Sequence, residues 1–351
     1  MATRATVVSL GIGLSVSLVC GAALEGQQFS ARSGSTVTLG ARVQVQYEAS
    51  SEADVPASFF LRRAWVTIDG TLNDLVSGRV QLNANGSSVL EAYLQLTTSP
   101  AFRVQIGQFK RAMSYYWLAA NSDLPLIERD GRVTGVDHCP GVGGVCSFGQ
   151  FTGVLGLDNY EPGILMTGRF AGRMGYRFTL TNGEGLGKKD VNTRKSASGR
   201  LSMYFAENSR LSAYVALDET LDSHGETMGV PALGAEWEIG TWRQGPHLLV
   251  NGLRGRNWKL NDDATFSAFQ VMGLWYRPLD PGSGLAAIEP MIRVSWASTE
   301  TDDNGNIAGT VITPGVMVYA AGRNGISANL DLYRSDGRGD WSLKIQAFTF
   351  F

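Results

Sequence analysis

Apolar and polar residues alternate along most of the chain with a period of two. The alternation is clearest in the ranges 41–48, 76–83, 90–97, 102–107, 173–180 and 326–333. Successive side chains of a β-strand point to opposite faces, so each range predicts a strand with one apolar and one polar face. Turn-forming pairs such as Asn85-Gly86 and Asn182-Gly183 separate these ranges. The pattern predicts about 16 antiparallel strands in an all-β chain.

Two all-β architectures fit this alternation. In a transmembrane barrel the apolar face contacts lipid, the polar face lines a water-filled lumen, and closure leaves no unpaired strand edge. In a soluble secreted β-sandwich, which would bind a ligand, the apolar face is the core. The length of the strands and their Arg-, Gln- and Tyr-rich polar faces favour the barrel. Tryptophans near the expected strand ends, Trp65 and Trp237 among them, fit the aromatic girdles of such barrels.

The two ends of the chain favour export and insertion into a membrane. Arg4 is followed by an apolar stretch and the small residues Gly21-Ala22-Ala23, which predicts a signal peptide over residues 1–23 and a single barrel domain over 24–351. The chain stops on an alternating strand that ends in an aromatic residue. We expect the apolar face of this strand to be the signal that the outer-membrane assembly machinery recognises: Leu343, Ile345, Ala347 and Phe351.

Acidic and basic residues are nearly equal in number, but the basic residues are mostly arginine. The chain has 30 basic and 32 acidic residues, which argues against nucleic-acid binding. Of the basic residues, 24 are arginine and 6 are lysine; arginine suits the two-pronged binding of carboxylate or phosphate groups. The alternation places one set of arginines on the lumen side: Arg42, Arg63, Arg79, Arg103, Arg173, Arg177, Arg200 and Arg293. Lumen carboxylates such as Asp218 and Asp331 could neutralise them and leave weak ion selectivity.

Short motifs in the right order resemble the phosphate-selective porin O and P family. They are the GQFK segment at 107–110 with Glu128-Arg129, the NGEG segment at 182–185, the EPMIR strand at 289–293 and the strand from Thr313 to Tyr319. The resemblance implies a 16-stranded barrel of the bacterial outer membrane, commonly a homotrimer, with a long loop folded into the pore. It implies passive diffusion of small hydrophilic solutes, including anions such as phosphate. The segment after Lys110 departs from the family pattern and lacks its lysines, which weakens the case for phosphate.

The stretch from 110 to 146 is the longest without alternation, and long irregular segments usually carry function. Charge at the narrowest point of a pore sets its ion preference. We therefore expect this stretch to form the constriction, although its charges could equally be those of a solvated loop. Its charged residues are Lys110, Arg111, Glu128, Arg129, Asp130 and Arg132.

Other chemistry has little support in the sequence. Cys139 and Cys146 are the two cysteines left once the signal peptide is removed, and in an oxidising periplasm they are expected to form a disulfide. The chain has three histidines and no recognisable catalytic arrangement. We expect no enzyme activity, metal or cofactor; a barrel that serves as an enzyme or adhesin remains the alternative. Expected partners are outer-membrane lipid, small solutes or anions, the assembly machinery and further copies of the chain.

Overall fold

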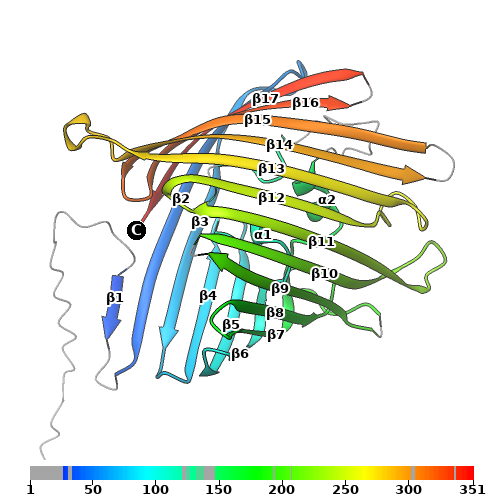
Figure 1. Cartoon of the computed structure of the whole chain (residues 1–351), viewed down its shortest axis with the longest axis horizontal. Coiled ribbons are helices and arrows are strands. Elements are labelled where there is room, and N and C mark those ends of the chain that lie inside the picture. Colours follow the sequence, from blue (N-terminus) through cyan, green and yellow to red (C-terminus); the bar gives the residue numbers. More distant parts are fainter. Residues whose placement is uncertain are drawn as a thin grey trace, which may run out of the picture.

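Within the part of the chain that the structure describes, sixteen antiparallel strands close into a β-barrel in this computed structural model (Figure 1). Each barrel strand pairs with its neighbour in the sequence, and β17 pairs with β2 over residues 42–50 to close the barrel. The short strand β1 pairs with the start of β2, beyond the end of β17. The prediction of a closed antiparallel barrel of about 16 strands is confirmed, and the β-sandwich alternative is excluded.

The strands and helices have the following bounds: β1 (Gln27–Ser30), β2 (Thr36–Ser50), β3 (Ser58–Thr71), β4 (Val76–Asn83), β5 (Ser88–Ser99), β6 (Phe102–Lys110), α1 (Tyr115–Leu118), α2 (Phe148–Val154), β7 (Tyr160–Phe170), β8 (Met174–Thr181), β9 (Ser196–Ala206), β10 (Ser209–Leu221), β11 (Thr227–Thr241), β12 (Gln244–Arg256), β13 (Thr265–Pro278), η2 (Pro281–Ser283), β14 (Ala287–Thr301), β15 (Gly305–Ala321), β16 (Asn324–Ser335) and β17 (Arg338–Phe350).

The structure describes residues 27–30, 34–120, 124, 126–131, 133, 136, 147–192, 194–206, 208–301, 305–335 and 337–351. The predicted signal peptide over 1–23, Arg132 and the two cysteines Cys139 and Cys146 lie outside the described residues.

The apolar face of the strands points outward, as the alternation predicts. Val80, Leu94 and Ile345 are 39%, 49% and 39% exposed on the outside of the barrel. The last strand follows the same rule: Ile345, Ala347 and Phe351 are exposed and Leu343 is half-buried. The backbone N–H of Phe351 also donates to the carbonyl of Ala41 at 2.9 Å, which extends the closing seam by one residue. A continuous apolar exterior of this kind is what acyl chains contact in a membrane barrel.

Two β-bulges change the face of particular residues. In β5, Gln81 pairs with Glu91 and Leu82 pairs with Val89, so Leu90 is an extra residue. Leu90 is therefore buried, although simple alternation places it on the outer face with Leu94. A second bulge lies in β3 at Arg62, between the pairs that join Gln44 to Arg63 and Val45 to Leu61.

The connections at the two ends of the barrel differ in length. Short turns at 72–75, 100–101, 171–173, 242–243 and 322–323 join strands at one end, where β1 and the last residue of the chain also lie. The connections at the other end include longer ones at 51–57, 182–195 and 257–264, and the longest runs from 111 to 159 between β6 and β7. Among the described residues, no helix is long and apolar enough to cross a membrane.

Candidate functional site

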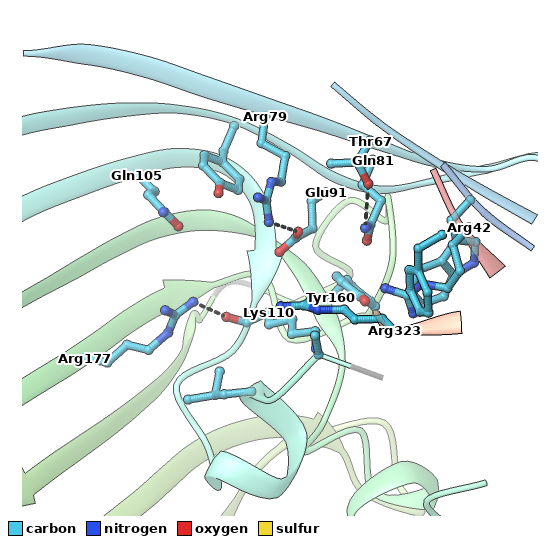
Figure 2. Close-up of a pocket in the computed structure, with 15 residues that line it drawn as sticks. Arg42, Thr67, Arg79, Gln81, Glu91, Gln105, Lys110, Tyr160, Arg177 and Arg323 are labelled. Carbon is cyan, nitrogen blue, oxygen red and sulfur yellow. Dashed lines mark hydrogen bonds and ion pairs between the residues drawn. The ribbon is translucent and has the colours of Figure 1, made fainter. Parts of the chain in front are cut away.

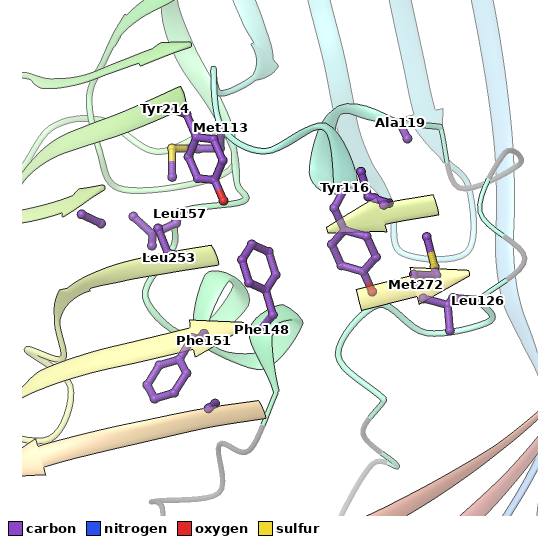
Figure 3. Packing of buried hydrophobic residues seen from close by; sticks show 14 of the residues in the cluster. Met113, Tyr116, Ala119, Leu126, Phe148, Phe151, Leu157, Tyr214, Leu253 and Met272 are labelled. Atoms are coloured by element: carbon purple, nitrogen blue, oxygen red, sulfur yellow. The ribbon is translucent and has the colours of Figure 1, made fainter. Parts of the chain in front are cut away.

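The connection between β6 and β7 folds back into the barrel, where α1 and α2 lie against one side of its inner wall (Figure 1). An apolar cluster holds it there (Figure 3). Tyr116 of α1 packs edge-on against Phe148 of α2, and Phe151 stacks on Phe266 of β13 with ring centroids 4.6 Å apart. The wall supplies further apolar side chains from β10, β12, β13 and β14: Tyr214, Leu249, Leu253, Met272 and Met291. We call the described residues between 111 and 159 the in-folded segment; they cover the wall from β10 to β14.

One end of the in-folded segment is fixed by a buried ion pair. Arg111, which is 1% exposed, donates from Nη1 to Asp218 Oδ2 of β10 at 2.9 Å, and its Nη2 contacts the other carboxylate oxygen. Nη1 also donates to the carbonyl of Gly156, within the segment, at 3.2 Å. Arg111 therefore supports the segment and lines neither cavity described below, which differs from the expectation that it forms the constriction.

A second ion pair fixes the segment to the opposite wall. Glu128 is bound by both Arg62 and Arg63 of β3; Arg62 Nη2 donates to Oε2 at 2.9 Å and Arg63 Nη2 at 3.3 Å. Neighbouring strand residues normally point to opposite faces, but the bulge at Arg62 lets both reach the same carboxylate. Burial alone raises the pKa of Glu128, but the charges of Arg63 and Arg62 outweigh burial and lower that pKa to about 2. Glu128 is therefore ionised at neutral pH.

A third contact joins the segment to β14, β16 and β17. Arg293 Nη1 donates to the carbonyl of Arg129 at 2.6 Å, and its Nη2 lies 3.0 Å from Asp331 Oδ1. Lys344, which is 0% exposed, donates to the carbonyl of Gly131 and to Asp331 Oδ2, both at 2.7 Å. Arg129 itself turns its guanidinium toward α1, where it donates to the carbonyls of Tyr116 and Ala119.

On the uncovered side, the inner wall borders a cavity of about 390 Å³ (Figure 2). It is lined by five cationic side chains, Arg42, Arg79, Lys110, Arg177 and Arg323, and by one carboxylate, Glu91. Lys110 donates to the carbonyls of Trp117 and Ala119 at 3.0 and 3.2 Å, and Arg177 donates to the carbonyl of Lys110 at 3.1 Å. Four aromatic residues also line the cavity: Trp65, Tyr93, Tyr160 and Phe350.

A second cavity of about 370 Å³ lies along β6 to β10. Among the described residues, its lining includes no carboxylate and five arginines: Arg103, Arg169, Arg177, Arg200 and Arg210. Leu118 of α1 and Arg177 of β8 line both cavities, so the two adjoin where the end of α1 faces β8. The described residues therefore place the charged, uncovered part of the lumen along the wall from β2 to β10.

The predicted site residues divide between passage and support. Of the residues predicted to form the constriction, Lys110 lines the first cavity. The in-folded segment is held in place by Arg111, Glu128 and Arg129. The carbonyl of Asp130 accepts a hydrogen bond from the hydroxyl of Ser147 at 3.1 Å. Of the predicted lumen arginines, five line a cavity: Arg42, Arg79, Arg103, Arg177 and Arg200. Arg63 and Arg293 bind the segment. Arg173 differs from expectation because it lies in the exposed turn between β7 and β8.

Sequence reasoning missed several residues of the lumen. Leu118, Arg169, Arg210 and Arg323 line the cavities, and Lys344 anchors the segment. Trp65 lines the lumen rather than the outer girdle, and Arg42 lies over its ring at 4.5 Å. The sequence does carry one sign of the apolar wall that lies under the in-folded segment. In stretches such as 247–253 and 268–275 apolar residues occur on both faces, apart from His247, Asn251 and Gln270, which indicates strands covered inside as well as outside.

Acidification is expected to tighten the packing of α2. Burial raises the pKa of Asp158 to about 6, against the opposing effect of the hydrogen bond that Thr152 donates to Oδ2 at 2.9 Å. The docked segment thus binds this proton more tightly than a released segment, whose Asp has a pKa of about 3.9. Docking therefore weakens as pH rises through this range and levels off above about pH 7.

Hydrogen exchange of the amides over 147–157, corrected for intrinsic rates, is therefore expected to be slower at pH 5 than at pH 7.5. In Asp158→Asn this difference should vanish. An equal difference in the wild type and in Asp158→Asn would contradict the assignment to Asp158.

Three comparisons place the fold among known proteins. No model of a protein family matches the chain. No curated protein matches it in sequence. Solved structures do match it: OmpT of Vibrio cholerae at a TM-score of 0.60 and 10% identity, over 93% of this chain and 100% of that one. Salmonella typhi OmpF, in complex with daunomycin, matches with a TM-score of 0.60 and 10% sequence identity, over 92% of this chain and 100% of that one. An anion-selective porin from Comamonas acidovorans matches with a TM-score of 0.61 and 12% sequence identity, over 90% of this chain and 100% of that one.

The chain has the fold of bacterial outer-membrane porins. Combined with its apolar exterior, this fold is that of a protein of the bacterial outer membrane. Among the described residues, no group of three or more His, Cys, Asp and Glu side chains could hold a metal ion.

Proposed function

We propose that the chain is an outer-membrane channel for passive diffusion of small hydrophilic solutes, with a preference for anions. The observation that carries this proposal is the composition of the two adjoining cavities, where the described lining residues include nine basic side chains and one carboxylate. Charge of one sign along a passage with low-dielectric walls raises the local concentration of the oppositely charged ion. Guanidinium groups also offer paired donors from which an anion can pass to the next site.

Carboxylates behind the lining reduce the preference without cancelling it. Arg79 contacts Asp69 and Glu91, Arg200 contacts Glu236, and Arg210 contacts Glu238. Within the described part of the chain, no carboxylate lies at ion-pair distance from Lys110, Arg103 or Arg177. We therefore expect a modest anion preference rather than an exclusive one.

The test is a reversal potential in a KCl gradient, measured on the purified mature chain in a planar bilayer. We expect discrete current steps and a reversal potential of the sign that marks chloride as more permeant than potassium. Adding phosphate on one side then tests whether phosphate competes with chloride, as the resemblance to the phosphate-selective family suggests. A clear cation preference would contradict the proposal. A sealed bilayer without steps would favour a barrel that acts as an enzyme or adhesin.

The same proposal includes the route to the membrane and the assembly. A signal peptide over 1–23 directs export, and the assembly machinery recognises the last strand through Leu343, Ile345, Ala347 and Phe351. Three copies then associate in the membrane. Support for the trimer comes from one solved structure of similar fold, which is described as a trimer form of Vibrio cholerae OmpT.

A further inference from the structure

Cationic and aromatic side chains are interleaved in the first cavity, and this combination bears on which anion it holds. Arg42 lies close to two rings, 4.5 Å from the centroid of Trp65 and 5.1 Å from that of Phe350. Lys110 lies 4.7 Å from the ring of Trp117 and 5.9 Å from that of Tyr160. Figure 2 shows Tyr160 and Lys110 together at the centre of the lining, with Arg42 and Arg323 at one side.

Aromatic walls of this kind do not favour a small inorganic anion. The face of an aromatic ring carries the negative part of its quadrupole, so it attracts cations and repels a bare anion. Phosphate or chloride would gain from the basic side chains alone and would gain nothing from the four rings. An anion that itself carries a ring gains from both, because it stacks on the aromatic side chains and on the flat guanidinium groups.

Donors for a carboxylate group remain at the same place. Arg177 lines the cavity and donates from Nη2 to the carbonyl of Lys110 at 3.1 Å, one of the five N–H groups of its guanidinium. Lys110 uses two of its three N–H donors on the carbonyls of Trp117 and Ala119. A volume of about 390 Å³ also lies within the roughly 300–1,000 Å³ range of small-molecule sites.

We infer that the first cavity is a binding site for aromatic carboxylates, which the channel therefore takes up in preference to aliphatic and inorganic anions. The ring lies among Trp65, Tyr160 and Phe350, and the carboxylate accepts hydrogen bonds from Arg177 and Lys110. This inference rests on the proposed function, because it names the solute class of the same passage.

The experiment measures block of chloride current through the wild-type channel by four anions at matched ionic strength and pH 7.5. Benzoate is the probe, and cyclohexanecarboxylate is its control because it has the same charge and a similar size without a π-system. Acetate and inorganic phosphate complete the series. We expect half-block by benzoate at a concentration about five-fold lower than by cyclohexanecarboxylate, with acetate and phosphate weaker still. Equal block by the two ring acids, or strongest block by phosphate, would overturn the inference.

Two variants locate the site, and a third is their matched control. Trp65→Leu and Tyr160→Leu should each bring the ratio between the two ring acids to within two-fold while chloride current persists. Trp237→Leu, on the outer face of β11 where the side chain is 47% exposed, should keep the wild-type ratio. A benzoate preference that survives both lumen variants would overturn the placement. If the wild type carried no chloride current at all, the proposed channel function itself would be refuted. That result differs from a channel that conducts chloride without preferring benzoate, so the two failures can be told apart.

Discussion

Replacing Asp218 by leucine is expected to release the in-folded segment from the wall of the barrel. The substitution leaves the guanidinium of Arg111 buried, at 1% exposure, without its carboxylate. Removing one partner of a buried ion pair typically costs about 3–5 kcal/mol, because the remaining charge is neither paired nor hydrated. This cost falls on the docking of the segment rather than on the strand ladder, since Arg111 lies outside β6 and contacts β10 only through its side chain.

Single-channel recording on Asp218→Leu should therefore show larger and noisier current steps than the wild type. Limited proteolysis should cut between 111 and 159. The double variant Arg111→Met/Asp218→Leu should recover most of the wild-type behaviour, because an apolar pair of similar volume often replaces a buried ion pair at little cost. Glu300→Gln is the surface control. It removes an exposed pair with Arg254 at 3.4 Å, for which a change within about 1 kcal/mol is expected. Wild-type currents in Asp218→Leu would show that the apolar cluster and the other two anchors hold the segment without the Arg111–Asp218 pair.

Reversing the charge of Arg177 is expected to reverse much of the ion preference. Arg177 lines both cavities and has no carboxylate at ion-pair distance among the described residues. A unit charge acts on an ion 4 Å away with about 1 kcal/mol in water, and with more between low-dielectric walls. Arg177→Glu changes the local charge by two units. The ratio of chloride to potassium permeability should then fall roughly ten-fold.

Arg173→Glu supplies the matched control for this charge change. Arg173 lies four residues earlier on the same hairpin, exposed in the turn between β7 and β8 and outside both cavities. Its reversal should shift the potential far less, and the shift should disappear at high salt, where exposed charges are screened. Equal shifts in the two variants would mean that the entrance, and not the junction of the cavities, controls selectivity.

The strands and their faces were readable from the sequence because one physical rule governs nearly all of them. A side chain on a barrel strand faces either acyl chains or the lumen, so Val80 and Ile345 fall outside and Gln46 and Lys344 fall inside by parity alone. The rule fails wherever a bulge adds a residue. Leu90 and Arg62 lie on a different face from the one that alternation predicts for this reason. The alternation itself does not indicate where a bulge lies.

The roles of the charged residues were less readable than their faces. Arg111 and Lys110 are adjacent and equally basic, yet one is buried against Asp218 and the other lines the passage. What separates them is contact with residues more than a hundred positions away, which depends on barrel register and on how the segment docks. Glu128 shows the same dependence, since its partners Arg62 and Arg63 converge only through the bulge. Local sequence identifies such charges as candidates and leaves their partners undetermined.

The three anchors of the in-folded segment also have a mechanical consequence. They attach it to β3 through Glu128, to β10 through Arg111, and to β14 and β17 through the carbonyls of Arg129 and Gly131. In the closed order of sixteen strands, β3 and β10 stand almost diametrically opposed. The segment thus connects two opposite walls of the barrel. We expect this connection to resist flattening of the barrel under the lateral pressure of the surrounding bilayer.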